Sequence, residues 1–128
     1  MENYYLAIDI GASSGRHILG HIEQGKIVLE EIWRFENGMQ VRDGSLCWDL
    51  PYLYREIKTG IKKCKELGKI PVSMGIDTWA VDYVLLDEND QVIGKSYGYR
   101  DNRTQEMDEE VYKIISESEL YSRTGIQK

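Results

Sequence analysis

The sequence predicts an α/β fold in which a mixed sheet begins as an antiparallel meander and carries packed helices. Apolar residues alternate with polar ones from residue 4 to residue 35, around a hairpin signal at Gln24-Gly25. A long stretch with helical periodicity follows, from residue 50 to residue 67. A second alternating segment, 72–77, comes directly after it. This order is typical of a chain that returns to its first sheet through a crossover helix.

The first strands are bounded by turn signals. Residues 4–10 are rich in apolar and aromatic side chains at a period of two, and the same period continues on both sides of Gln24-Gly25. Asn37-Gly38 and Asp43-Gly44 mark further turns. We expect strands over 4–10, 16–23, 26–35 and, more briefly, 46–48.

The predicted long helix has a start signal, an apolar stripe and a stop signal. Asp49 is placed to cap its first turn, and Pro51 lies where a missing N–H costs nothing. The stripe recurs at spacings of three and four, and consists of Leu50, Leu53, Tyr54, Ile57, Ile61, Cys64 and Leu67. Gly68 follows as a helix-ending glycine.

The second half of the chain is predicted to be a strand, a hairpin and two helices. After the strand over 72–77, extended segments at 81–86 and 91–94 flank a turn at Asn89-Asp90. Apolar spacing then indicates a helix over 107–115. Ser116 and Glu119 form a capping-box pattern for a last helix that Gly125 closes.

Composition excludes several classes of protein. The net charge of −6 over 128 residues, with no basic patch, argues against a nucleic-acid surface. No apolar run approaches the length of a membrane span, and the N-terminus lacks the pattern of a signal peptide, so we expect a cytoplasmic protein. Cys47 and Cys64 are too few for a disulfide framework or a zinc site. No linker interrupts the chain, which favours one domain.

The most informative stretch follows the first predicted strand and consists of Gly11, Ala12, Ser13, Ser14, Gly15 and Arg16. Small residues let a backbone approach a phosphate, consecutive amides cradle its oxygens, and the hydroxyls and the guanidinium add donors. Asp9, at the strand end, is placed to face a hydrated Mg²⁺. The stretch lacks the ending of a Walker A loop and the helix of a dinucleotide fingerprint. A tight turn between two strands explains the same residues without a ligand.

This stretch resembles, from Ala7 to Arg16, the first phosphate loop of the actin-like ATPases, whose domains have a ribonuclease H-like fold. Among them it is similar to the FGGY family of carbohydrate kinases. The form Gly-Ala-Ser-Ser-Gly-Arg resembles the branch of the family that acts on L-rhamnulose. Further blocks resemble the same family in the same order: 34–38, 48–49, 75–87, 99–104 and 121–127. Ordered blocks across the whole chain are far more specific than one loop.

The resemblance implies an ATP-dependent, Mg²⁺-using kinase that transfers the γ-phosphoryl group of ATP to the 1-hydroxyl of a ketose, L-rhamnulose. It implies that residues 11–16 contact the ATP phosphates and that Asp9 holds Mg²⁺ through water. The sugar-contacting residues that it implies are Asp77, Trp79, Ala80, Asp82, Arg100 and Asp101. Ala80 stands where some family members carry a glycine that touches the ketose, so an extra methyl group lies at that wall.

Each of these residues also has a structural explanation. Trp79 is explained equally well by core packing, and Asp82 by an exposed strand end. Arg100 and Asp101 fit a helix cap with a surface ion pair.

The family's catalytic base, an aspartate in a His-Asp-Thr-like motif, has no counterpart in residues 1–128. The resemblance therefore implies the N-terminal part of a first actin-like domain, inactive alone. Two alternatives stay open: a kinase of another ketose or polyol in the same family, and a non-catalytic module that senses nucleotide or sugar. An uncovered sheet edge would favour self-association.

Overall fold

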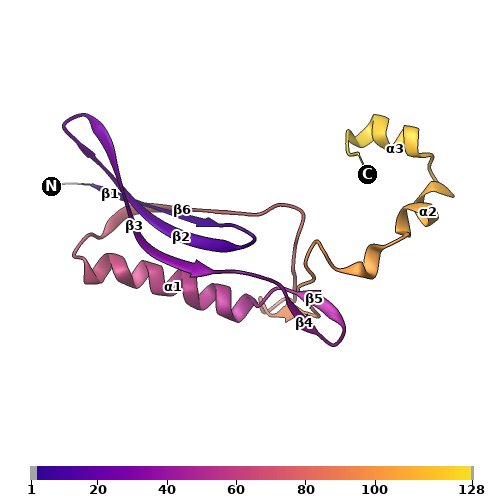
Figure 1. The fold of residues 1–128 in the computed structure, drawn as a ribbon, viewed down its shortest axis with the longest axis horizontal. Helices are drawn as coiled ribbons and strands as arrows, with labels where there is room; N and C mark the ends of the chain where they lie inside the picture. Colours follow the sequence, from indigo (N-terminus) through magenta and orange to yellow (C-terminus); the bar gives the residue numbers. More distant parts are fainter. Residues whose placement is uncertain (1–2, 128) are drawn as a thin grey trace.

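The computed structural model describes residues 3–127 (Figure 1). Its elements, in chain order, are β1 Tyr4–Ile10, β2 Ser14–Glu23, β3 Lys26–Glu36, β4 Gln40–Arg42, β5 Ser45–Cys47, α1 Leu50–Glu66, β6 Pro71–Thr78, β7 Leu85–Leu86, β8 Val92–Ile93, the 3-10 helix η1 Asn102–Thr104, α2 Met107–Tyr112 and α3 Glu117–Thr124. This order confirms the α/β prediction.

The main sheet has four strands in the order β3-β2-β1-β6. β1, β2 and β3 pair antiparallel, and β6 returns parallel to β1 after the crossover through α1. The β2–β3 hairpin turns at Gln24 and Gly25, whose φ values of 50° and 76° are those of a type I′ turn. The predicted mixed sheet is therefore confirmed.

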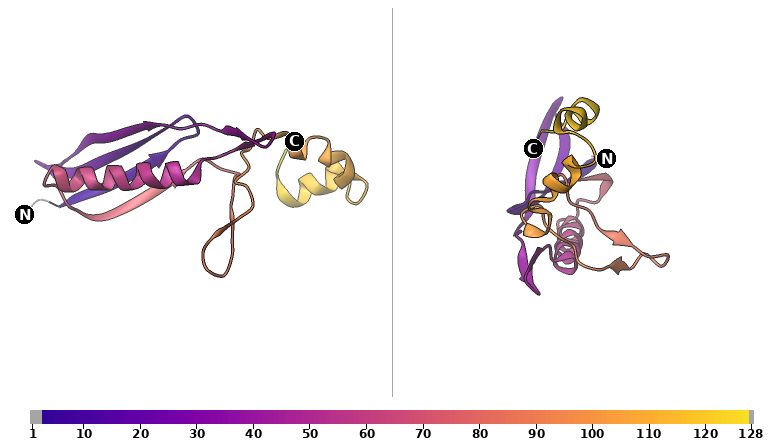
Figure 2. Two further views of the ribbon diagram at one scale, coloured as in Figure 1. Left: turned by 90° about the horizontal axis from the view of Figure 1, so that it is seen from below. Right: turned by 90° about the vertical axis from the view of Figure 1, so that its right-hand side faces the viewer.

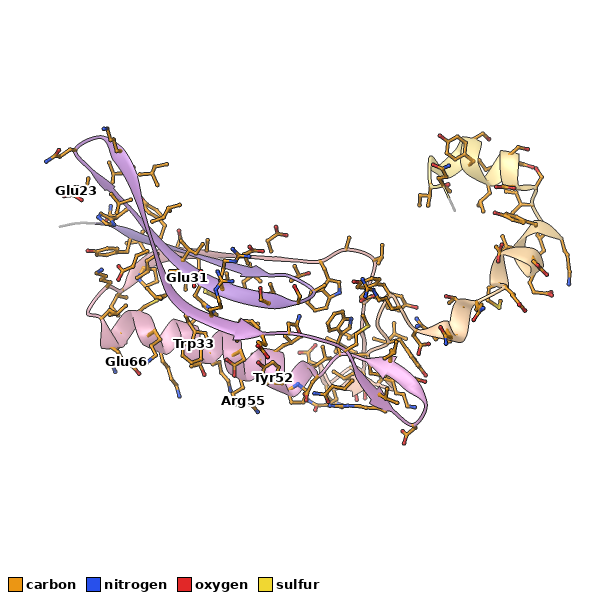
Figure 3. The ribbon with its side chains drawn as sticks, in the orientation of Figure 1. Glu23, Glu31, Trp33, Tyr52, Arg55 and Glu66 are labelled. Atoms are coloured by element: carbon orange, nitrogen blue, oxygen red, sulfur yellow. The ribbon has the colours of Figure 1, made fainter. Side chains whose placement is uncertain are left out.

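The core lies between the sheet and α1, which runs along one face (Figure 1). Leu6, Ile8 and Ile10 of β1 point into it and are at most 3% exposed. Two polar bonds fasten β3 to the helix (Figure 3): the Trp33 indole donates to Glu56 Oε2 at 3.0 Å, and the Tyr52 hydroxyl donates to the Glu36 carbonyl at 2.7 Å. Burial of Leu53 and Cys64, with Leu50, Ile57 and Ile61 packed beside them, and these bonds together fix the helix on the sheet. Tyr54 and Leu67, predicted as part of the same stripe, are 63% and 46% exposed, so the buried stripe is narrower than predicted.

Both ends of α1 follow the sequence signals. Asp49 accepts a hydrogen bond from the Tyr52 amide at 3.0 Å, which satisfies one of the free donors of the first turn. Gly68 follows the last turn with a φ of 69°, a left-handed conformation that costs glycine little. The predicted burial of Cys64 is also confirmed, at 1% exposure.

Several boundaries differ from the prediction. β2 begins at Ser14 rather than Arg16, because Gly15 pairs with Ile10 and the turn shrinks to residues 11–13. Within 81–86 only Leu85 and Leu86 form a strand, since Val81 has a φ of 71° that interrupts extended backbone. α2 ends at Tyr112 rather than at residue 115.

The prediction that helices pack on the sheet is confirmed for α1. It is wrong for α2 and α3, which lie beyond the end of the sheet (Figures 1 and 2). Ser116 caps α3 by accepting from the Glu119 amide at 3.3 Å, and Gly125 ends it at a φ of 67°, as predicted. Within residues 3–127, no helix is long and apolar enough to cross a membrane.

The face of the sheet opposite α1 is left uncovered by residues 3–127. Tyr5, Ile22 and Leu29 of this face are 48%, 58% and 67% exposed. They line part of a broad hollow of about 770 Å³, which reaches Asp9 and Asp77 at one end. Its mostly apolar walls suit protein packing better than a polyhydroxylated ligand.

Candidate functional site

Two loops leave the sheet side by side at the carboxyl ends of its parallel strands. β1 ends at Ile10 and β6 at Thr78, and these two residues are paired in the register. The loop after β1 holds the predicted phosphate-binding residues, and the loop after β6 holds Trp79, Ala80 and Asp82. In open α/β sheets, ligands bind outside the carboxyl ends of the strands. The topology therefore brings both sequence-predicted regions to one end of the sheet.

The phosphate-loop candidates separate into a turn and a strand. Gly11, Ala12 and Ser13 form the turn, closed by a hydrogen bond from the Gly11 amide to the Ser14 carbonyl at 2.9 Å. Within residues 3–127, the amides of Ala12 and Ser13 and the hydroxyls of Ser13 and Ser14 make no hydrogen bond. These free donors at a small-residue turn fit the oxygens of a phosphate group.

Gly15, by contrast, is fixed by packing. It lies in β2 on the buried face, where a Cβ atom would stand 2.1 Å from Cζ of the Phe35 ring. Such a distance is far inside van der Waals contact, so only glycine fits. The second glycine of the motif is accordingly explained by the core, without a phosphate.

Asn37 holds the turn from the side of β3. Its side-chain Nδ2–H donates to the Gly11 carbonyl at 2.9 Å, and its backbone amide donates to the Ser13 carbonyl at 3.0 Å. Because both bonds are accepted by carbonyls, the amides of Ala12 and Ser13 stay available to an anion. From the sequence, Asn37-Gly38 is predicted only as a turn, and the resemblance of residues 34–38 to the family is the signal of a further role for Asn37.

The carboxylates of Asp9 and Asp77 belong to neighbouring parallel strands and share the open face of the sheet, where their residues are paired. On the other side of Asp9, Arg16 Nε stands 3.4 Å from Asp9 Oδ2. Asp9 is about half exposed at its side chain, so its oxygens are accessible to a hydrated cation. Within residues 3–127, no group of three or more metal-ligating side chains occurs.

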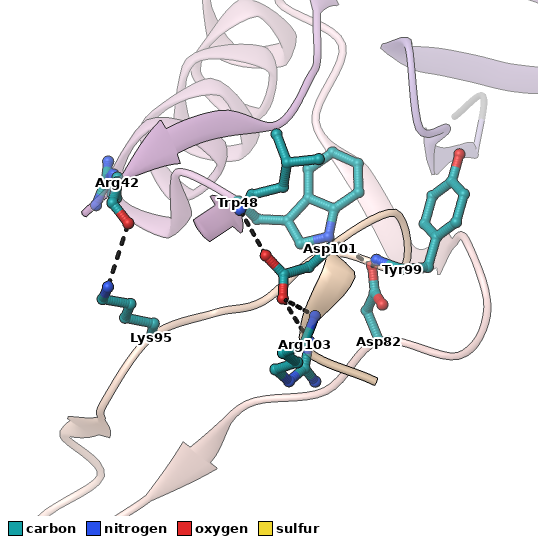
Figure 4. Close-up of polar contacts among 8 residues, drawn as sticks. Arg42, Trp48, Asp82, Lys95, Tyr99, Asp101 and Arg103 are labelled. Atoms are coloured by element: carbon teal, nitrogen blue, oxygen red, sulfur yellow. Dashed lines mark hydrogen bonds and ion pairs between the residues drawn. The ribbon is translucent and has the colours of Figure 1, made fainter. Parts of the chain in front are cut away.

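Asp82 brings together an aromatic cluster. Its Oδ2 accepts the indole N–H of Trp48 at 2.6 Å, the indole N–H of Trp79 at 2.8 Å and the backbone amide of Tyr99 at 3.2 Å. The two indole rings lie 4.1 Å apart between centroids, at an angle of 39°. Figure 4 shows Asp82 reaching Trp48 and Tyr99 from its loop. The prediction that Asp82 is an exposed strand end does not fit this arrangement.

A hollow of about 180 Å³ opens beside this cluster. Its walls include the two indoles, Asp82, and the polar side chains of Thr78 and Ser96. Aromatic faces with a few polar groups are typical of a small-ligand site. Trp48 was not among the predicted sugar-site residues, because Trp79, its partner in the ring stack, lies far along the chain.

Arg100 and Asp101 have different places. Arg100 is exposed, with its guanidinium carbon 5.4 Å from the centroid of the Tyr99 ring. The Asp101 carboxylate accepts from the Leu46 amide at 2.8 Å and from the Arg103 amide at 3.0 Å. These hydrogen bonds hold the pKa of the Asp101 carboxyl below its ordinary value. Asp101 thus caps η1 and fastens it to β5, as the structural alternative expected.

Known proteins were compared with the chain. The model of the FGGY family of carbohydrate kinases, N-terminal domain, matches residues 4–128. A rhamnulokinase of Halalkalibacterium halodurans is 56% identical over 98% of the chain, and a rhamnulokinase of Bacillus subtilis is 46% identical over 96% of it. The chain spans only 27% and 25% of the lengths of these two relatives.

Solved structures resemble the fold. Gluconate kinase of Lactobacillus acidophilus aligns with a TM-score of 0.76 over 98% of the chain and 25% of its own, at 17% identity. Xylulose kinase of Rhodospirillum rubrum aligns with a TM-score of 0.76 over 96% of the chain and 26% of its own, also at 17% identity. These likenesses confirm the actin-like ATPase fold. The family match over residues 4–128 establishes that the chain belongs to the FGGY family of carbohydrate kinases.

Proposed function

We propose that the chain is the N-terminal part of a rhamnulokinase, which transfers the γ-phosphoryl group of ATP to the 1-hydroxyl of L-rhamnulose. The observation that carries this proposal is the pairing of Ile10 with Thr78, which sets the phosphate-loop turn beside the Trp79–Asp82 loop. The substrate is inferred from relatives that are 46–56% identical and named rhamnulokinase. Phosphoryl transfer depends on holding donor and acceptor in one geometry, and two adjacent loops are suited to that.

The residues of each loop take separate tasks. Free amides at Ala12 and Ser13, and the hydroxyls of Ser13 and Ser14, bind phosphate oxygens. Asp9 would bind the water molecules of a hydrated Mg²⁺, and Arg16, with its Nε 3.4 Å from Asp9 Oδ2, would help to hold that carboxylate in place. When bound, ATP with Mg²⁺ supplies the phosphoryl group and neutralises part of its charge.

The sugar loop supplies a wall for the ketose. Trp79 presents an aromatic surface to the C–H groups of a sugar, and Thr78 and Ser96 offer hydroxyl partners to its oxygens. Ala80 is exposed next to Trp79, at the position where some family members carry glycine. None of the carboxylates described here is assigned as the base that activates the sugar hydroxyl.

A chimeric enzyme tests the proposal. Residues 4–128 would replace the matched 125 residues of the Halalkalibacterium halodurans rhamnulokinase, which are 56% identical. Purified chimera is then assayed for ATP-dependent phosphorylation of L-rhamnulose, D-xylulose, L-ribulose and glycerol. The unmodified relative is the matched control.

We expect the chimera to prefer L-rhamnulose, with kcat/KM within about tenfold of the control, a loss of no more than ~1.4 kcal/mol. A folded chimera that prefers D-xylulose, L-ribulose or glycerol would assign the chain to another kinase of the family. A folded chimera that phosphorylates none of them would favour a sensing module. The isolated chain is expected to show no turnover in the same assay.

A further inference from the structure

We infer that Asp82 is a positioning residue that holds Trp79, through one carboxylate oxygen, as the aromatic wall of the sugar site. The inference rests on the proposed function, because it assigns the hollow beside Trp48 and Trp79 to the sugar. It differs from the expectation that Asp82 binds sugar hydroxyls directly. The role follows from the position of Asp82 Oδ2 and from the three hydrogen bonds that this oxygen accepts.

The Oδ2 atom of Asp82 joins three segments that are distant in the sequence. Trp48 comes from the junction between β5 and α1, Trp79 from the exit of β6, and the Tyr99 amide from the segment before η1. The segments that carry Trp48 and Trp79 are not paired as strands within residues 3–127. The Asp82 carboxylate is the acceptor that both indoles share. The wall is therefore assembled by tertiary contact alone.

Its bonds are strong in this environment. Trp48 is 3% exposed, and its indole N–H has only this acceptor within residues 3–127. A hydrogen bond to an ionised carboxylate is shorter and stronger than one between neutral groups, and a buried donor that loses its acceptor is costly. Removing the acceptor would leave two indole N–H groups competing for water, so the indole pair would separate.

The same bond restrains a strained backbone. Val81 has a φ of 71°, a conformation in which a β-branched residue is a genuine outlier. Its side chain is exposed, so burial of Val81 itself does not compensate for the strain. Trp79 on one side and Asp82 on the other are tied together, with 2.8 Å between Nε1 and Oδ2. This tie closes a short loop around Ala80 and Val81 and fixes where Trp79 and Asp82 lie in the wall of the hollow.

Three donors on one oxygen argue against that oxygen also binding sugar. A carboxylate oxygen has about two lone-pair sites, and Oδ2 already accepts from Trp48, Trp79 and Tyr99. Any effect of Asp82 on the sugar through Oδ2 must accordingly pass through the groups that this oxygen holds, of which the Trp48 and Trp79 rings line the hollow. Experiments can therefore distinguish a residue that positions the indoles from one that binds the sugar directly.

The first experiment reads the indole N–H resonances of the isolated chain by ¹H–¹⁵N NMR. The chain has three tryptophans, and Trp33, bonded to Glu56, is an internal reference. In Asp82→Asn, the signals of Trp48 and Trp79 should move upfield and their exchange with water should accelerate about tenfold, while Trp33 stays in place. Glu56→Gln should move Trp33 alone. Unmoved Trp48 and Trp79 signals in Asp82→Asn would overturn the inference.

The second experiment measures KM in the chimera described above. Asp82→Leu, which has no acceptor, should raise KM for L-rhamnulose about tenfold, with KM for ATP within about twofold. Asp82→Asn keeps an acceptor oxygen and should raise KM for the sugar by only about threefold. Glu88→Gln, an exposed side chain on the β7–β8 turn, should change neither value.

The outcomes separate the two claims. A wild-type chimera that does not phosphorylate L-rhamnulose refutes the proposed function, and the sugar-site role of Asp82 with it, while the resonances still decide whether the bonds exist. If the chimera is active and neither Asp82→Asn nor Asp82→Leu changes its KM for the sugar, the positioning role alone is refuted. If Asp82→Leu does not fold, Asp82→Asn decides. A threefold rise in its KM for the sugar supports the positioning role, and an unchanged KM contradicts it.

Discussion

Asn37, just past the end of β3, donates its side-chain amide to the Gly11 carbonyl at 2.9 Å and so fixes the turn after β1. The bond joins two segments 26 residues apart. A turn of small residues has many accessible conformations, and its order then depends on such an outside contact. The phosphate-loop turn is thus shaped by β3 as much as by its own sequence.

Replacing Asn37 tests that dependence. Asn37→Ala should lower the free energy of unfolding by about 1 kcal/mol and raise KM for ATP several-fold in the chimera, because the turn loses its anchor. Urea denaturation and initial rates at varied ATP are the measurements. Asn89→Ala is the matched control, because the Asn89 side chain in the β7–β8 turn makes no hydrogen bond to any residue from 3 to 127. Equal KM values in the two variants would count against the anchor.

His17 predicts a pH dependence. It is fully buried between β2 and α1, where Nε2–H donates to the Ile57 carbonyl at 3.1 Å and Nδ1 has no partner within residues 3–127. Burial lowers the pKa of His17 below its ordinary value of 6.5, although the Ile57 bond offsets part of this. Since the folded state disfavours the proton, this contribution to stability is complete above pH ~6.5 and is lost as pH falls towards the lowered pKa.

The measurement is the free energy of unfolding in urea at half-unit steps from pH 8 to about pH 5. Wild type should lose stability below pH ~6.5, with a slope from His17 of at most about 1.4 kcal/mol per pH unit. His17→Leu should be less steep over the same interval, because no ionisable group remains at that position. Parallel curves for the two proteins would show that His17 does not exclude a proton.

Gly60 of α1 is expected to be intolerant of a side chain. A Cβ atom there would lie 2.3 Å from ring atoms of His17. Gly60→Ala should therefore destabilise the fold by about 1–3 kcal/mol, even though alanine favours a helix. Gly75→Ala is the control, since nothing lies within 4 Å of its added Cβ. Thermal unfolding compares the two, and equal midpoints would contradict the close packing of His17 on α1.

The strands and helices that the sequence predicts well are those whose apolar side chains recur with a regular period. Alternation over 4–10 and the stripe from Leu50 to Leu67 each repeat with the period of their structure, so β1 and α1 appear nearly at their predicted bounds. Ser14 and Gly15 carry no such pattern, since both are small, and the start of β2 was missed for that reason. The phosphate-binding role of Ser13 and Ser14 stays a prediction.

The cluster around Asp82 could not be predicted from local sequence patterns. Trp48 and Tyr99 lie 34 and 17 positions from Asp82, and nothing in their spacing indicates a common acceptor. The return of β6 beside β1 and the backbone hydrogen bonds between the β5 segment and residues 96–98 bring them together. The residue types were visible in the sequence, but their convergence depends on tertiary structure.

The central claim is that the two neighbouring loops carry the two substrates separately. A steady-state KM matrix for the chimera tests it, with Ser13→Glu in the β1–β2 turn and Ala80→Leu in the loop after β6. Ser13→Glu should raise KM for ATP about tenfold by charge repulsion, and Ala80→Leu should raise KM for L-rhamnulose about tenfold by filling its wall. The other KM should stay within about twofold in each case. Crossed effects, or unchanged KM values in both folded variants, would contradict the account.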